Sequence, residues 1–364
     1  MRVVFAVNGD PSKPITQAAS LASARYRGLI PAGEMARRQI RSEVFTVFDL
    51  LRPNFDTDGI DLLVLHQPKH DIVAAQNVIG VLLERLDMIR RNGGVIVIDV
   101  SDFKFGDSFR AMLRQIIGEA RTAMYHMILN ELFARCTAIT TPTENLADQM
   151  RGALRQPAPV YVIEDVVEVA RGEPRFAPGD TLNMLWFGQL VSHAAALQKF
   201  VHTDLPRIAG TRPVTLTMLC EPVSAEDAAR YFGPSPEARG IHFEQWSVPA
   251  LDQALARCDL VVLPVDTEAA GAKGKSNNRV LQSLYAGRCV VAHPLDSFQK
   301  LGDFVRLDRS IPAAIAATLA DPATAVACVR QGQAYLDQHY TPAAITDRWL
   351  EICRDLTAKR EPAP

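Results

Sequence analysis

Apolar residues recur along the chain as short continuous runs, the pattern of strands buried on both faces of a parallel sheet. Six runs occupy the first half, at residues 2–7, 43–48, 61–65, 95–100, 136–141 and 160–167. Five more follow, at residues 182–187, 214–219, 241–244, 260–265 and 289–292. Segments with helical periodicity, such as residues 71–91 and 107–133, lie between the runs. This alternation predicts an α/β fold with two doubly wound parallel sheets.

A stretch rich in Pro, Gly and charged residues at positions 171–181 separates the two halves and indicates a linker. A length of 364 residues exceeds what one core usually supports, and a hydrophobic content of 48% is enough for two cores. We predict a first domain at residues 1–170 and a second at residues 171–342. An amphipathic helix at about residues 343–358 closes the chain.

The net charge and the cysteine spacing argue against two functional classes, nucleic-acid binding and metal binding by cysteines. A formal net charge of −2 argues against a nucleic-acid partner, which normally requires a basic surface. Six cysteines are scattered without C-x-x-C or Cys/His spacing, which predicts reduced thiols in a cytoplasmic protein and no metal site. Apolar runs fall short of the ~20 residues of a membrane span. We therefore expect neither a membrane-spanning segment nor an export signal.

A strand, a polar loop and a helix in succession form a predicted βαβ unit over residues 259–294. Four polar residues crowd the start of its helix: Lys275, Ser276, Asn277 and Asn278. Unpaired N–H groups and the helix dipole favour an anion at such a place, and Lys275 adds a full positive charge. Gly287 is suited to end the helix in the left-handed conformation. The segment therefore predicts a phosphate-binding site.

Two other interpretations of this helix start remain open. Residues 269–276 depart only at Ala269 from the pattern G-x-x-x-x-G-K-[ST] of nucleoside triphosphatases. However, the predicted strand ends near Val265, several residues too early for that loop. The second alternative is a solvated helix start without any ligand.

Polar residues also follow two strands predicted in the first half. His66 comes directly after the run at 61–65, and Asp102 follows the run at 95–100. Because the carboxyl ends of parallel strands form the ligand-binding edge, both residues are candidates for chemistry. Asp99 and Asp102 form a D-x-x-D pair that could act as a base, a metal site or a binder of substrate hydroxyls.

The order of Pro264, a loop, Lys-Ser-Asn-Asn-Arg at 275–279, Ala-Gly-Arg at 286–288 and Val-Val-Ala at 290–292 resembles the donor-binding segment of GT-B glycosyltransferases, in particular family 4. The sequence Ser-Ala-Arg-Tyr-Arg at 23–27 resembles the first loop and helix of the same group. The resemblance implies two Rossmann-like domains that face an interdomain cleft. It also implies that the C-terminal helix crosses back to the first domain.

In that family the loop and helix hold the diphosphate of a nucleotide-sugar, and a Glu in the helix binds the ribose. The implied donor site consists of Gly188, His193, Trp246, Lys275, Ser276, Asn277, Asn278, Arg279 and Gln282. Gln282 stands in place of the Glu, and the Arg and Lys pair that usually follows the glycine is absent. More of the diphosphate binding then falls on Lys275 and Arg279.

On the acceptor side, the resemblance places Arg25 and Arg27 at the cleft, with His66 and Asp102 as catalytic candidates. GT-B enzymes generally work without a metal, so we favour acceptor binding over a metal site for the D-x-x-D turn. No cofactor is implied, because the nucleotide-sugar is a substrate.

The resemblance implies a metal-independent, retaining glycosyltransferase, and we expect its acceptor to be a glycan, a lipid-linked sugar or another molecule, in surface polysaccharide or lipopolysaccharide assembly. Arg110, Arg114 and Arg121 recur on one helix face and leave open a peripheral contact with the inner face of the membrane. Two alternatives remain. One is a GT-B nucleotide-sugar epimerase, with Asp102 and Glu268 as loose acid/base candidates, and the other is a non-catalytic GT-B partner protein.

Overall fold

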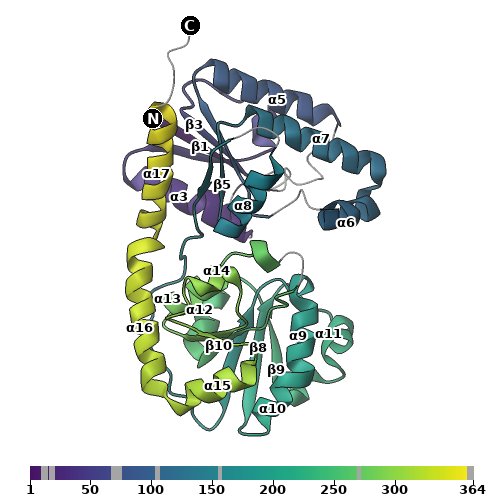
Figure 1. Ribbon diagram of the computed structural model, residues 1–364, viewed down its shortest axis with the longest axis vertical. Coiled ribbons are helices and arrows are strands. Elements are labelled where there is room, and N and C mark those ends of the chain that lie inside the picture. The colour runs from purple at the N-terminus through teal and green to yellow at the C-terminus, as the bar shows by residue number, and fades with distance from the viewer. Residues whose placement is uncertain are drawn as a thin grey trace. The chain divides into compact units, whose positions relative to one another are not determined.

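The computed structural model describes residues 1–9, 15, 21–66, 76–102, 107–154, 158–268 and 272–358. The chain divides into two compact units, one made of Met1–Val166 with Pro342–Pro364 and the other of Val167–Thr341. Each unit contains a six-stranded sheet whose neighbouring strands pair in parallel, and helices flank each sheet (Figure 1). The predicted α/β class with two doubly wound sheets is confirmed.

The strands of the first unit follow the predicted apolar runs: β1 (Arg2–Val7), β2 (Arg41–Thr46), β3 (Leu62–His66), β4 (Val95–Asp99), β5 (Ala138–Thr141) and β6 (Val160–Val162). Their order in the sheet is β2-β1-β3-β4-β5-β6. The chain steps from β1 to one edge and then builds the other side. The loops after β1 and β3 therefore diverge at a switch point.

Successive residues of β1 enter two different cores, because side chains alternate across a strand. Val4 and Ala6 belong to one core, whereas Val3 and Phe5 belong to the other. The helices of the first core are α5 (Gln76–Arg91), α6 (Asp107–Ile117), α7 (Glu119–Arg135) and α8 (Glu144–Ala153). Those of the second are α3 (Ile30–Arg37) and α17 (Pro342–Ala358). Burial on both faces explains why the run is apolar at every position.

The last helix, α17, completes the second of these cores. Trp349 is fully buried and meets the ring of Phe5 edge-on, with 5.6 Å between ring centres. Cys353 Sγ lies 3.3 Å from Met1 Sδ. The C-terminal helix thus belongs to the same unit as the N-terminal strand, as predicted.

The second unit has the strands β7 (Leu182–Phe187), β8 (Val214–Cys220), β9 (Ile241–Gln245), β10 (Leu260–Leu263), β11 (Cys289–Ala292) and β12 (Arg306–Leu307). Their order is β12-β11-β10-β7-β8-β9. The chain builds β8 and β9 on one side of β7 and then returns to place β10 on the other side. The loops after β7 and β10 therefore leave the sheet at a second switch point, where α/β sheets usually bind ligands.

The helices of this unit are α9 (Ala194–Lys199), α10 (Leu205–Ala209), α11 (Ala225–Phe232), α12 (Val248–Arg257), α13 (Asn278–Tyr285), α14 (Asp296–Gln299), α15 (Ile311–Ala320) and α16 (Pro322–His339). Helices α15 and α16 were not predicted from the sequence. Helix α15 is rich in Ala on all sides, which hides its periodicity. The N-terminal caps could have indicated both helices. Ser310 and Asp321 accept hydrogen bonds from the first turns, and a proline lies within the first two positions of each helix.

Residues 172–175, part of the predicted linker, lie in the second unit against the end of α13. Gly172 N donates to Tyr285 O at 3.0 Å, and Arg175 N donates to Gly287 O at 3.1 Å. Gly287 ends α13 with a φ of +77°, and a Cβ there would lie 2.3 Å from Glu173 O. A glycine is therefore required at this position for both its conformation and its close contact.

No single helix among the described residues is both long and apolar enough to cross a bilayer. Ile311–Ala320 and Pro322–Ala358 reach that length and composition only when taken together across a bend of 102°.

Candidate functional site

The loops that follow β7 and β10 meet at the switch point of the second unit. β7 ends at Phe187. The next residue, Gly188, has a φ of +146° that favours glycine, and a Cβ there would lie 3.4 Å from the Trp186 ring. The first loop then reaches His193, and the second reaches Lys275 before α13 begins. Lys275 Nζ lies 3.3 Å from His193 Nδ1. The structure thus brings together two predicted donor-site residues that are far apart in sequence.

Arg279, in the first turn of α13, adjoins this pair. Its guanidinium carbon lies 6.0 Å from the centre of the Trp186 ring. The same ring meets His193 edge-on, with 5.9 Å between ring centres. We call Trp186, His193, Lys275 and Arg279 the switch-point cluster. Trp186 was not among the predicted site residues, because a tryptophan inside an apolar strand has the sequence pattern of a core residue.

The switch-point cluster carries positive charge in the absence of a ligand. Burial lowers the pKa of the Arg279 guanidinium to about 10, which leaves it charged at neutral pH. Burial lowers the pKa of His193 to about 3, and the charges of Arg279 and Lys275 act in the same direction. His193 is therefore neutral, and its Nδ1 accepts from the Lys275 ammonium group.

Polar atoms around the start of α13 lack hydrogen-bond partners within the described part of the chain. They are Trp186 Nε1, Asn277 Oδ1, Asn278 Nδ2 and Arg279 Nη1, all enclosed by the protein. Asn277 is buried directly before α13, but its side chain forms no capping bond to the described helix. Trp186 Nε1, Asn278 Nδ2 and Arg279 Nη1 are hydrogen-bond donors, whereas Asn277 Oδ1 is an acceptor. Because folded proteins pair most buried polar atoms, the three donors indicate a place where the oxygens of an anionic ligand supply the missing contacts.

Gln282, one turn further along α13, is fully buried. Its Oε1 accepts hydrogen bonds from the backbone N–H groups of Glu168, at 2.9 Å, and Val169, at 3.3 Å. The amide oxygen therefore ties α13 to the segment that enters the second unit. The predicted contact between Gln282 and a ribose remains a prediction.

Replacing Gln282 with methionine, which has a similar volume, should lower the free energy of unfolding by about 1–3 kcal/mol, because two backbone donors lose their acceptor. Urea unfolding followed by circular dichroism measures this loss. Ser283→Ala is the matched control, since the Ser283 hydroxyl donates to the carbonyl of Arg279 within its own helix, at 2.7 Å. Equal losses for both variants would show that Gln282 does not hold this segment.

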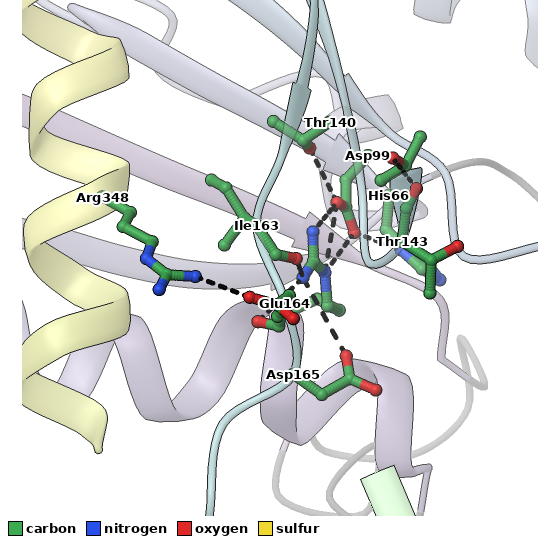
Figure 2. Close-up of polar contacts among 10 residues, drawn as sticks. His66, Asp99, Thr140, Thr143, Ile163, Glu164, Asp165 and Arg348 are labelled. Atoms are coloured by element: carbon green, nitrogen blue, oxygen red, sulfur yellow. Dashed lines mark hydrogen bonds and ion pairs between the residues drawn. The ribbon is translucent and has the colours of Figure 1, made fainter. Parts of the chain in front are cut away.

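In the first unit, a buried ion pair occupies the ends of β3 and β4 (Figure 2). Arg27 Nη2 lies 2.5 Å from Asp99 Oδ1, and Arg27 Nε lies 3.1 Å from Oδ2. Thr140 Oγ1 donates to Asp99 Oδ1 at 2.7 Å, and His66 Nδ1 lies 3.0 Å from Oδ2. Arg27 Nη1 also donates to the backbone carbonyl oxygen of Ile163. The Asp99 carboxylate thus has three polar neighbours on three different elements.

Electrostatics keeps both members of this pair charged. Burial alone would raise the pKa of the Asp99 carboxyl, but Arg27 and His66 hold it well below its usual range. Burial alone would lower the pKa of the Arg27 guanidinium, but Asp99 outweighs this effect and raises it. Because an ionised carboxylate only accepts hydrogen bonds, His66 carries its proton on Nδ1. Asp99 therefore orients the His66 ring, as a base-orienting carboxylate does in other enzymes.

The contacts of the remaining predicted residues do not indicate a function for them. Arg25 is buried beside Tyr26, with its guanidinium carbon 5.3 Å from the ring centre. Asp102 is exposed after β4, whereas Asp99 of the same D-x-x-D pair is buried. Trp246 is half-buried against the core after β9, and Ser276 is half-buried before α13. The functional assignments of these residues remain predictions.

Part of the helix-start segment lies outside the described residues. Residues 269–271, including the Ala269 of the triphosphatase alternative, fall in that gap. Among the residues that the structure describes, no group of three or more His, Cys, Asp or Glu side chains is arranged to hold a metal ion.

Known proteins match this chain in three-dimensional structure. No protein-family model and no curated protein matches its sequence. The fold is similar to that of HepE from Anabaena in complex with UDP, with a TM-score of 0.61 and 14% identity over 98% of this chain and 100% of that one. Sucrose-phosphate synthase from Thermosynechococcus elongatus gives a TM-score of 0.62 and 12% identity over 98% and 99% of the two chains.

A larger protein, from a GtfA/B complex, gives a TM-score of 0.54 and 12% identity. The match covers 82% of this chain but only 58% of that one. At these identities the likeness concerns the fold, and it confirms the predicted GT-B architecture.

Proposed function

We propose that this GT-B chain is a glycosyltransferase that moves a sugar from a nucleotide-activated donor to an acceptor. The switch-point cluster carries the proposal, because Lys275 and Arg279 place two cations beside enclosed polar atoms that have no partner among the described residues. A diphosphate matches this arrangement in charge and in hydrogen-bonding capacity. The fold neighbour HepE was solved with UDP, which supports a nucleotide at such a site.

The same cluster fits the chemistry of glycosyl transfer. Negative charge grows on the diphosphate as the bond to the sugar breaks, so fixed cations stabilise the transition state more than the bound donor. Arg279 is held by α13 and the Trp186 ring before any ligand binds, which limits reorganisation. We propose that the reaction is metal-independent and retaining.

The finer assignments extend the proposal. The acceptor is a glycan or a lipid-linked sugar of surface polysaccharide or lipopolysaccharide assembly, and the protein acts in the cytoplasm at the inner face of the membrane. We assign the acceptor side to the first unit, where Asp99 orients the candidate catalytic His66. Arg27 is bound to Asp99, so its part is to hold this carboxylate in place.

A panel of nucleoside diphosphates and nucleotide-sugars tests the donor site by thermal shift. A ligand present at 100 times its Kd should stabilise the protein by about 2.7 kcal/mol. Mass spectrometry of reactions with glycan acceptors then tests transfer. Donor binding without transfer or epimerisation would favour the non-catalytic alternative, and interconversion of the donor sugar would favour the epimerase.

Lys275→Ala should weaken the binding of the best nucleotide by about 1.5–3 kcal/mol, because it removes a charge-assisted contact to phosphate. Titration calorimetry measures the change. Lys300→Ala is the control, since Lys300 follows α14 and rests on the ring of Tyr340. An unchanged affinity in Lys275→Ala would place the phosphates elsewhere.

A further inference from the structure

His193 is the member of the switch-point cluster whose charge a bound anion could change near neutral pH, because an imidazole free of such cationic neighbours titrates between about pH 5 and 8. Its ring is half-buried, and its Nδ1 lies 3.3 Å from Lys275 Nζ. A protonated ring at this distance would set two positively charged donors against each other. The ring therefore remains neutral while Lys275 uses it as an acceptor.

Two cationic side chains oppose protonation of His193, and the nearby carboxylate of Glu221 is engaged with backbone N–H groups. Lys275, before α13, and Arg279, within α13, both oppose protonation of the ring. Glu221, after β8, accepts hydrogen bonds from the backbone N–H groups of Leu190, at 3.0 Å, and Val191, at 3.3 Å, in the turn before His193. Its carboxylate is thus occupied by backbone donors. The balance at the ring is positive, and a bound anion would reverse it.

We propose that His193 takes up a proton from solution when the diphosphate of a nucleotide-sugar binds at the switch-point cluster, an inference that rests on the proposed donor site. A phosphate oxygen replaces Nδ1 as the acceptor for the Lys275 ammonium group. Nδ1 is then free to carry a proton and to donate to the same diphosphate. His193 becomes a third cation at the site only while the donor is bound.

Titration calorimetry with UDP-glucose near pH ~6.5, in buffers of different ionisation enthalpy, measures this uptake directly. Each phosphate of UDP-glucose carries one ester and one anhydride linkage, which leaves only a strongly acidic group, so the ligand does not titrate in this range. ADP-glucose and GDP-mannose serve as further probes. We expect uptake of roughly half to one proton per bound donor, and an affinity that falls by up to about tenfold per pH unit as the pH rises through the pKa of the complex.

His193→Gln keeps a neutral acceptor and should bind the probe without proton uptake. His242→Gln is the matched control, because His242 is exposed on β9 and should leave the uptake unchanged. Binding by the wild type without uptake, or uptake that persists in His193→Gln, overturns the inference. If His193→Gln fails to bind, a wild-type affinity that is constant from about pH 5.5 to 8 overturns it. If no probe binds the wild type, the proposed donor site is wrong as well. Failure of the donor site is thus distinguished from failure of the proton-uptake inference alone.

Discussion

Asp99→Ala should lower the free energy of unfolding by about 3–5 kcal/mol, because the buried Arg27 guanidinium loses its closest carboxylate and retains only the more distant Asp165, at 3.9 Å. Asp99 has no exposed surface, and His66 and Thr140 would lose the same acceptor. Differential scanning calorimetry and urea unfolding measure the loss, with separate transitions assigned to the two units where they are resolved. Asp102→Ala, at the exposed end of the same D-x-x-D pair, should change stability little.

The double variant Arg27→Met with Asp99→Ala separates an unpaired charge from a general loss of packing. Removing both charges should recover part of the stability that Asp99→Ala loses, because the buried guanidinium that lacks its closest carboxylate is then also gone. A double variant no more stable than Asp99→Ala would contradict the assigned cause.

The ion pair also makes stability depend on acid pH. The folded state holds the pKa of Asp99 below that of the unfolded chain, which is about 3.9. The pair therefore stabilises the fold above that pH, and this contribution is lost as the pH falls toward and through the folded pKa. In Asp99→Ala this component of acid sensitivity should be absent.

Removing both cations of the donor site, as Lys275→Ala with Arg279→Met, should weaken nucleotide-sugar binding by about 3–6 kcal/mol if their contributions of about 1.5–3 kcal/mol each add. Calorimetry with the best ligand of the panel measures this loss of affinity. For most donors the remaining affinity would be too weak for calorimetry to detect. A double variant that still binds within tenfold of the wild type would exclude the switch-point cluster as the diphosphate site.

The stability of Arg279→Met provides the control for this loss. Arg279 Nη1 is enclosed without a hydrogen-bond partner among the described residues, and burial disfavours its charge. Methionine should therefore leave the free energy of unfolding of the ligand-free protein unchanged or raise it by up to about 1 kcal/mol, which keeps or raises the melting temperature. Nucleotide-sugar binding should be lost in the same variant. A lower melting temperature would show that Arg279 supports the fold instead.

The sequence predicted the strands well because their signal is local. β1 and β7 coincide with the apolar runs, since strands buried on both faces need no partner to be recognised. The order of the strands was not predicted, because it is set by pairing between residues far apart in the sequence. The helices α15 and α16 were missed because the apolar side chains of Ala give little contrast between faces.

The site was predictable in part for the same reason. A lysine and polar residues before a helix form a local pattern, so that pattern alone pointed to Lys275, whereas Arg279 was named from the resemblance to a known family. The partnership between Arg27 and Asp99 joins residues 72 positions apart, and its geometry is set by tertiary packing. Likewise, nothing in the sequence around Gln282 showed that its oxygen accepts from Glu168 and Val169.

The membership of α17 in the first unit has a consequence for how the chain is made. Met1 and Cys353, in contact through their sulfur atoms, are 352 residues apart, and Trp349 packs on Phe5 of the first strand. A ribosome therefore releases the whole second unit before the residues that finish the first core exist. Domains generally fold as units while synthesis proceeds at about 5–20 residues per second. All residues of the second unit are therefore made before α17, and the part of the first core that α17 supplies, on the face that α3 also covers, is missing until that helix has been synthesised.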